Sequence, residues 1–278
     1  MILIADSGST KTDWALQSES GSLERFHTQG INPFHQDRTV IVEILRRELL
    51  PQLNLDAISN VFFYGSGVRP DQETVMFSLL QEAFPHARQV EAYSDLLGSA
   101  RALCGHNYGI ASILGTGANS CLYDGNGIIQ HTPALGYILG DEGSGSVLGK
   151  RFIHDLYGGK LSEEIKTMFE KETRLNLPEI IKRVYRQPLA NRFLASLSEF
   201  IGNHLDDAGV RAVVIDNFVD FLRYHIQPYN RPDLPVSFVG SVAWHYQDEL
   251  REAAERLNFQ LGTVLKTPLA GLVRYHKL

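Results

Sequence analysis

The first residues that could do chemistry form a short turn, rich in glycine and hydroxyl side chains, at residues 6–13. Small residues such as Gly8 let backbone N–H groups approach a phosphate, Lys11 can add positive charge, and Asp6 can hold a hydrated Mg²⁺ ion. Hydroxyl donors are added by Ser9, Thr10 and Thr12. The stretch predicts a phosphate-binding turn, with an ordinary β-hairpin as the alternative.

A second turn of the same kind lies at residues 114–120 and contains Gly115, Thr116 and Gly117. It occupies the same place in a strand-turn-strand unit that the chain uses twice. Two such turns could hold one polyphosphate from both sides. A single turn without a binding role would not explain this arrangement. The coincidence favours phosphate binding over two unrelated hairpins.

Two further sites carry carboxylates. Asp95 follows a predicted strand at 90–93, where open α/β sheets place their ligands, and it could act as a base. The alternative is that Ser94 or Asp95 caps the helix that follows. Asp141 and Glu142 stand between glycines before a predicted helix, so they could bind a polar ligand or cap that helix.

Other chemistry is excluded by spacing. Residues 143–151 resemble a P-loop, but Arg151 replaces the Ser or Thr that would hold magnesium. The ten histidines lack metal-ligand spacing, and Cys104 and Cys121 are too few for a disulfide framework or a zinc site. These cysteines fit a reducing compartment.

The elements that must position these residues follow from the hydrophobic pattern. Short alternating or β-branched runs predict strands, and longer periodic segments predict helices. In the first part, we predict strands at 1–5, 12–17, 23–28, 61–64 and 90–93, and helices at 40–49 and 72–83. In the second part, we predict strands at 110–114, 120–123, 127–131, 236–240 and 259–265, and helices at 145–157, 162–171, 178–185, 247–257 and 269–276. We also predict a long helical region from 189 to about 227.

Composition bounds the remaining possibilities. A chain of 278 residues with 44% hydrophobic residues is long enough for two lobes, each with its own core. The formal net charge of −6, with scattered Lys and Arg, argues against nucleic acid as a partner. Nowhere do about 18 apolar residues run together, so we expect neither membrane insertion nor secretion, and a cytoplasmic location.

The motifs together carry a family resemblance. Residues 6–12 and 115–117 resemble the two phosphate motifs of the superfamily that contains actin, hexokinases and the seventy-kilodalton heat-shock chaperones, and residues 238–242 resemble its adenosine motif. Within it, the chain most resembles the BadF/BadG/BcrA/BcrD ATPase family, in its N-acetylglucosamine kinase branch. The further motifs that carry this resemblance, in chain order, are residues 30–32, 94–99, 136 with 140–145, 240–244 and 269–271.

The resemblance implies a fold and a division of the chain. The expected fold is α/β, a two-lobed actin-like (ribonuclease H-like) ATPase fold with a duplicated βββαβα unit and a cleft between the lobes. Residues 1–104 would form the N-terminal lobe, with the closing helix at 267–278 packed on it, and residues 105–266 would form the C-terminal lobe.

The resemblance also implies roles for residues. Asp95 matches the catalytic aspartate, and Asp6 would hold Mg²⁺. ATP would be bound by Asp6, Gly8, Ser9, Thr10, Lys11, Thr12, Gly115, Thr116, Gly240 and Ser241. The sugar would be bound by Asn32, Gly117, Asn119, Asp141 and Gly145.

The implied function is transfer of phosphate from Mg²⁺·ATP to an amino sugar, with N-acetylglucosamine and its 6-hydroxyl as the leading expectation. A nucleotide-driven switch that acts on a protein partner is the alternative, and a catalytically silent sugar sensor is a third reading. The cysteines that would hold the iron-sulfur cluster of dehydratase-activating ATPases are absent, which favours the kinase. A homodimer is compatible with the sequence.

Overall fold

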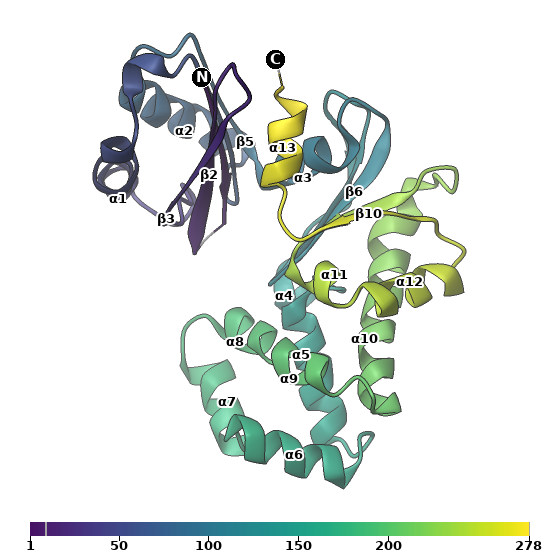
Figure 1. The fold of residues 1–278 in the computed structure, drawn as a ribbon. Helices are drawn as coiled ribbons and strands as arrows, with labels where there is room; N and C mark the ends of the chain where they lie inside the picture. The colour runs from purple at the N-terminus through teal and green to yellow at the C-terminus, as the bar shows by residue number, and fades with distance from the viewer. Residues whose placement is uncertain (9, 278) are drawn as a thin grey trace. The chain divides into compact units, whose positions relative to one another are not determined.

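The computed structural model describes residues 1–8 and 10–277, and the chain folds into two compact units (Figure 1). The first unit comprises Met1–Asn107, Gly125–Gly127 and Pro268–Leu278, and the second comprises Tyr108–Asp124 and Ile128–Thr267. Each unit is built on its own five-stranded sheet.

The first sheet is mixed, and its central strand carries the first turn. Its strands are β1 (Ile2–Ser7), β2 (Lys11–Gln17), β3 (Leu23–Gln29), β4 (Asn60–Gly65) and β5 (Gln89–Ser94). They lie in the order β3-β2-β1-β4-β5, with β1 antiparallel to β2 and parallel to β4. Because β1, β4 and β5 run parallel, their carboxyl ends meet at one edge.

Helices cover both faces of the first sheet (Figure 1). They are α1 (Arg38–Ile44), which continues through a π-helical turn (Leu45–Leu49) and a 3₁₀ turn (Leu50–Gln52), then a short 3₁₀ turn (Leu55–Ala57), α2 (Pro70–Ala83), α3 (Asp95–Cys104) and α13 (Leu269–Tyr275). Side chains alternate along β1, so Leu3 and Ala5 join a core with α1 and α2. Ile2 and Ile4 instead join a core with α3 and α13.

The second sheet repeats the strand order of the first. Its strands are β6 (Gly109–Leu114), β7 (Ala118–Tyr123), β8 (Ile128–His131), β9 (Val236–Val239) and β10 (Leu261–Leu265). The order is β10-β9-β6-β7-β8, with β6 antiparallel to β7 and parallel to β9. The predicted α/β class and the duplicated strand unit are confirmed.

The second unit carries a long helical insertion between β8 and β9. Its helices are α4 (Gly136–Leu139), α5 (Gly145–Tyr157), α6 (Glu163–Thr173), α7 (Leu177–Arg186), α8 (Ala190–Ser196), α9 (Ser198–Asn203) and α10 (Ala208–Phe221), followed by a π-helical turn (Leu222–Ile226) and a 3₁₀ turn (Gln227–Tyr229). After β9 come α11 (Ser241–His245) and α12 (Gln247–Arg256). Among the described helices, none is long and apolar enough to span a bilayer.

The long helical region predicted over 189–227 is helical in the structure, but it is not one continuous helix. The structure divides this region into α8, α9 and α10, and the last break falls at His204–Asp207. Asp207 starts α10 as its N-cap, because its side chain accepts a hydrogen bond from the Val210 N–H. The helix α4 was not predicted.

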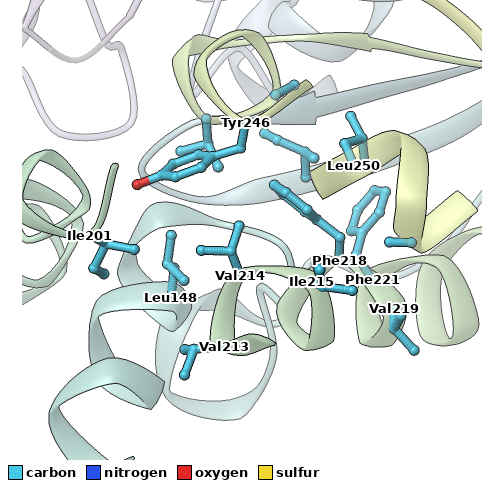
Figure 2. Close-up of a cluster of buried hydrophobic side chains, with 14 of the residues drawn as sticks. Leu148, Ile201, Val213, Val214, Ile215, Phe218, Val219, Phe221, Tyr246 and Leu250 are labelled. Carbon is cyan, nitrogen blue, oxygen red and sulfur yellow. The ribbon is translucent and has the colours of Figure 1, made fainter. Parts of the chain in front are cut away.

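The core of the second unit gathers around α10, which is apolar on nearly every side. Phe218 and Val214 of α10 lie in one cluster with Leu148 of α5, Ile201 of α9 and Leu250 of α12 (Figure 2). Burying one such large side chain contributes about 1.5–3 kcal/mol. The cluster therefore anchors α5, whose first residue is the candidate site residue Gly145, together with α9 and α12.

Candidate functional site

The first turn joins β1 to β2 in the first unit. The Gly8 N–H donates to the Lys11 carbonyl at 3.0 Å, and the side chains of Thr10 and Lys11 are exposed. The Ser9 prediction lies outside the described residues. The Thr12 hydroxyl is buried against Ser7 Oγ at 2.6 Å and reaches the Gln29 carbonyl at 3.2 Å. The Thr12 side chain therefore stabilises the turn. Only the backbone groups of Thr12 could contact a phosphate.

The loop that carries Asn32 is tied to this turn. Ser7 Oγ donates to the Ile31 carbonyl at 2.9 Å, and the Gly30 N–H donates to the Thr10 carbonyl at 3.0 Å. Asn32 is buried, and its Oδ1 accepts from the Phe34 N–H at 3.0 Å. The two residues that precede Asn32 are therefore hydrogen-bonded to the first turn and to the end of β1.

Three carboxylates gather at the carboxyl edge of the first sheet. Asp6 is the last residue but one of β1, Asp13 lies directly opposite it on β2, and Asp95 begins α3 after β5. Asp13 is paired with Lys11 Nζ at 2.8 Å and with His27 Nδ1 at 2.6 Å. This arrangement leaves Asp6 and Asp95 as neighbouring negative groups near the exposed turn.

Burial raises the pKa of both of these acids, and repulsion adds to the shift at Asp6. Burial, followed by repulsion from Asp13 and Asp95, raises the pKa of Asp6 to about 7, although Lys11 opposes the shift. Burial also raises the pKa of Asp95, against hydrogen bonds from its own N–H and that of Leu96. Such shifts are typical of functional carboxyl groups, and a cation placed here would relieve the repulsion.

The chemistry of this edge suits magnesium. Among the described residues, no group of three or more His, Cys, Asp or Glu side chains is placed to enclose a metal. Mg²⁺ does not require one, because it keeps several waters and binds through one or two carboxylates plus the phosphates of a nucleotide. Asp6 fits that pattern.

The placement of Asp95 depends on a close approach between α3 and β4. Ser94, not Asp95, is the N-cap of α3, since its Oγ accepts from the Leu97 N–H at 3.2 Å. A Cβ atom at Gly98 would lie 2.8 Å from Tyr64 side-chain atoms, so only glycine lets the helix rest on that ring. Arg101 adds a hydrogen bond to the Tyr64 hydroxyl at 2.7 Å. Ser94 therefore caps α3, while the Asp95 carboxylate accepts from the first N–H groups of the same helix.

The second turn, between β6 and β7, is fixed by the start of α5. The N–H groups of Gly145 and Ser146 donate to the carbonyls of Gly115 and Thr116 at 2.8 and 3.2 Å. The Gly115 N–H also donates to the Gly117 carbonyl at 3.0 Å. The predicted residues Gly115, Thr116, Gly117 and Gly145 therefore form one backbone assembly.

Asp141 is bound into the same assembly. It is buried, adopts a left-handed conformation with φ of 61°, and its carboxylate accepts from the N–H groups of Ala118 and Gly136. Burial, the largest influence, raises its pKa. The N-cap of α5 is Ser144, whose Oγ accepts from the Val147 N–H at 3.2 Å. Asp141 is therefore not the helix cap.

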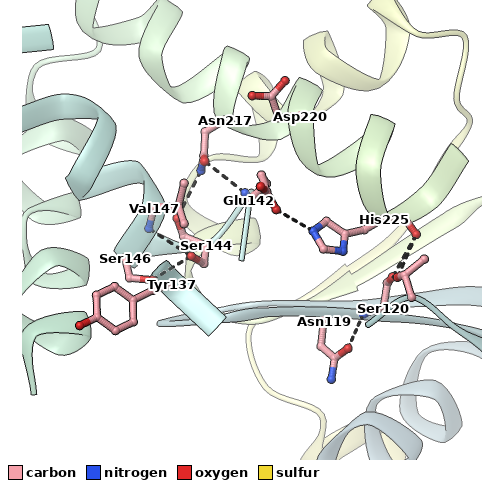
Figure 3. Close-up of polar contacts among 12 residues, drawn as sticks. Asn119, Ser120, Tyr137, Glu142, Ser144, Ser146, Val147, Asn217, Asp220 and His225 are labelled. Carbon is pink, nitrogen blue, oxygen red and sulfur yellow. Dashed lines mark hydrogen bonds and ion pairs between the residues drawn. The ribbon is translucent and has the colours of Figure 1, made fainter. Parts of the chain in front are cut away.

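Two residues that sequence reasoning missed hold the loop that follows Asp141. His225 Nε2 lies 2.9 Å from Glu142 Oε2. Asn217 accepts from the Gly143 N–H at 3.1 Å and donates to the Ser144 carbonyl at 3.3 Å (Figure 3). Both come from the helical insertion, 74 and 83 residues away from their partners. No local pattern could have identified them.

A cavity of about 410 Å³ lies within the second unit, beside the predicted adenosine motif. It is lined by residues of α9 and α11 and their ends, namely Ser198, Glu199, Gly202, Asn203, Ser241, Val242, His245 and Tyr246. Gly240 has φ of 126°, and a Cβ atom there would lie 2.2 Å from the Leu114 carbonyl oxygen. Only glycine can therefore connect β9 to Ser241 at this wall. The volume suits a nucleoside.

Two units with the same strand order, each with a glycine turn after its first strand, define the actin-like sugar kinase fold. The crystal structure of the putative N-acetylglucosamine kinase from Porphyromonas gingivalis matches with 49% identity and a TM-score of 0.95, over 100% of this chain and 99% of that chain. This chain belongs to the family of that protein.

More distant structures share the fold alone. The putative N-acetylglucosamine kinase from Chromobacterium violaceum has 16% identity and a TM-score of 0.68, over 99% of this chain and 98% of that chain. A putative N-acetylmannosamine kinase from Listeria monocytogenes has 12% identity and a TM-score of 0.52, over 99% and 97%. No protein-family model matches the chain, and no curated protein matches it either.

Proposed function

We propose that this protein is a cytoplasmic, ATP-dependent sugar kinase that phosphorylates an amino sugar, with N-acetylglucosamine as substrate and its 6-hydroxyl as acceptor. The observation that carries the proposal is the pair of perturbed carboxylates, Asp6 and Asp95, beside the first phosphate turn. The full-length similarity to a putative N-acetylglucosamine kinase supports the choice of substrate. A chain with only two cysteines fits a reducing cytoplasm.

Asp95 is the proposed general base. In the transfer, the sugar oxygen forms a bond to the γ-phosphorus, the bond from that phosphorus to the bridging oxygen of ADP breaks, and the hydroxyl proton passes to Asp95. The products are the sugar 6-phosphate and ADP. A carboxylate with a raised pKa accepts a proton more readily than an ordinary one, so burial of Asp95 suits this role.

The other residues of the first unit bind and orient. Asp6 would hold the Mg²⁺ ion, which would neutralise the charge of the transferred phosphate. Gly8 and the backbone of residues 10–12 would contact phosphate oxygens, and Lys11 would add positive charge. Asn32, fixed by its backbone neighbours, would contact the sugar.

The second unit would bind the remaining parts of both substrates. Gly115 and Thr116 would contact phosphate oxygens, and the cavity beside Gly240 and Ser241 would take the base. Asn119 and Asp141 would contact sugar hydroxyls, together with the backbone at Gly117 and Gly145. Positioning by these fixed groups supplies most of the catalysis expected for phosphoryl transfer.

A coupled assay of ADP release across a panel of hexoses and amino sugars tests this proposal. We expect release to depend strongly on an added amino sugar, with N-acetylglucosamine the best substrate. Hydrolysis of ATP at a comparable rate with no sugar present would contradict the kinase and favour a nucleotide-driven switch. Preference for another amino sugar would overturn only the assigned substrate.

A further inference from the structure

The side-chain amide of Asn119, on β7, makes two contacts through its oxygen. Its Oδ1 accepts from the N–H of Ser120 at 3.0 Å and lies 2.8 Å from His131 Nε2, on the neighbouring strand β8. Figure 3 shows the amide with its oxygen turned toward Ser120 and its nitrogen directed away.

These contacts identify the oxygen and the nitrogen atom of the Asn119 amide. A backbone N–H can only donate, so the Asn119 atom that meets Ser120 must be the oxygen. An amide oxygen can only accept, so His131 Nε2 must carry the proton that it donates. Burial and the nearby charge of His225 lower the pKa of His131, which favours a neutral ring protonated on Nε2.

Buried hydroxyl groups on the opposite side hold the two strands together. Ser120 Oγ lies 2.9 Å from Thr132 Oγ1 and 2.8 Å from the Tyr229 hydroxyl, and Thr132 Oγ1 lies 3.0 Å from that same hydroxyl. Both residues also reach the His225 carbonyl at 3.2 Å. Since successive side chains alternate between faces, this network leaves Asn119 and His131 together on the other face.

We propose that His131 is a positioning residue that fixes the Asn119 amide so that its Nδ2 group alone meets the sugar. Two donors occupy Oδ1, so the amide presents hydrogen-bond donors only. Asn119 therefore selects an oxygen acceptor of the substrate, such as a hydroxyl or amide carbonyl oxygen, at this position. The inference rests on the proposed function and adds a specificity-determining contact to it.

The first experiment compares His131→Leu with His131→Gln. The leucine variant loses the donor, so the amide can rotate, and we expect KM and Kd for N-acetylglucosamine to rise about 3- to 10-fold. The kcat value and the KM for ATP should stay unchanged. The glutamine variant keeps an N–H donor and should recover much of the affinity. His154→Leu, at an exposed histidine of α5 that contacts Asp155, is the matched control and should leave all constants unchanged.

A second comparison tests the donor itself. Asn119→Asp replaces the presented Nδ2 group by an oxygen, which would face the acceptor oxygen of the sugar. We expect a loss of sugar affinity of about 10- to 100-fold, larger than for His131→Leu, with unchanged nucleotide affinity. A deoxy-sugar panel then identifies the partner, because the analogue that lacks the relevant oxygen should bind wild type and variant alike.

Nitrogen NMR of the free protein provides a readout that needs no substrate. We expect His131 to be neutral with its proton on Nε2, and the Asn119 side-chain amide to lose its ordered signal in His131→Leu. A proton on Nδ1, or unchanged sugar affinity in His131→Leu, would overturn the inference. If wild-type protein with the expected His131 signal bound no sugar of the panel, the proposed function would be overturned instead.

Discussion

The two units share a topology but differ in how much repulsion their carboxyl groups meet. In the first unit, Asp6 lies near Asp13 and Asp95, and burial and their repulsion raise its pKa, while Asp95 accepts from backbone N–H groups at the start of α3. In the second, Asp141, Asn119 and Glu142 are each tied by hydrogen bonds to backbone groups or to a histidine. The first edge keeps its charge available for a proton and a cation, whereas the second keeps its groups oriented.

This contrast teaches that one duplicated fold can divide the work of a reaction. Groups that change protonation or bind a metal must not be fully satisfied by the protein. Groups that recognise a sugar gain from being fixed before it arrives, because less freedom is lost on binding. We therefore expect variants of Asp6 and Asp95 to change kcat and metal dependence, and variants of Asn119 and Asp141 to change sugar affinity.

Asp95→Asn should have the largest effect. The amide keeps the size of the side chain but cannot accept the proton, so kcat should fall about 10²- to 10⁴-fold with little change in nucleotide affinity. Steady-state kinetics and calorimetry measure both. Ser94→Ala is the control, because it removes the helix cap at a cost of about 1 kcal/mol in stability and leaves the carboxylate. A kcat close to that of wild type in Asp95→Asn would contradict both the role of Asp95 as the base and the contrast between the two units.

Asp141→Ala should have the next largest effect, and it should change the affinity for sugar instead of kcat. Loss of a charge-assisted hydrogen bond should cost about 1.5–3 kcal/mol in sugar binding, or about ten- to a hundredfold. Nucleotide affinity measured without sugar should change little.

Two comparisons separate direct from indirect causes at Asp141. Asp141→Asn tolerates the left-handed backbone and keeps an acceptor for the buried N–H groups, so it should preserve thermal stability better than alanine. Glu142→Ala, which leaves His225 without its partner, should affect the sugar less. Weaker ATP binding with unchanged sugar affinity in Asp141→Ala would assign Asp141 to the magnesium site and not to the sugar site.

Gly240→Ala tests the geometry beside the cavity of the second unit. Its Cβ atom would clash with the Leu114 carbonyl at a positive φ, so we expect a loss of stability of about 2–4 kcal/mol and weaker nucleotide binding. Gly127→Ala, where a Cβ atom meets nothing within 4 Å, should stay within about 0.5 kcal/mol of wild type. Equal melting temperatures for the two variants would contradict this account.

The smallest expected effect is the contribution of Asp6 to the pH dependence of stability. Its folded pKa of about 7 lies above its ordinary value of 3.8, so between these values the folded state binds more protons than the unfolded state. Stability without Mg²⁺ should therefore decrease as pH rises from about 4 to 7. In Asp6→Asn this contribution should be absent, so the melting temperature near pH 8 should rise by a few degrees relative to wild type.

Magnesium gives the complementary measurement. Mg²⁺ binds the ionised carboxylate, so the Mg²⁺ concentration needed for half-maximal activity should increase as pH falls below 7 in the wild-type protein. Asp6→Asn should need far more Mg²⁺ at every pH. An unchanged Mg²⁺ requirement in that variant would assign the cation to other groups.

The sequence by itself determined much of the local structure. Alternating apolar residues and glycine turns predicted the strands of both sheets, and their repetition predicted the duplicated topology. The helices α5, α6 and α7 were predicted to within one or two residues at each end, because caps such as Ser144 and Ser162 are local signals. The position of Asp95 at a strand end was readable for the same reason.

Only the tertiary structure decided how the site groups are used. It showed that Ser94 caps α3, that the Thr12 hydroxyl points inward, and that His225 and Asn217 reach the loop after Asp141 from a distant helix. It also divided the helical region predicted over 189–227 into separate helices. Turn and helix signals depend on neighbours a few residues away, whereas side-chain partners depend on contacts between segments that approach each other only when the core packs.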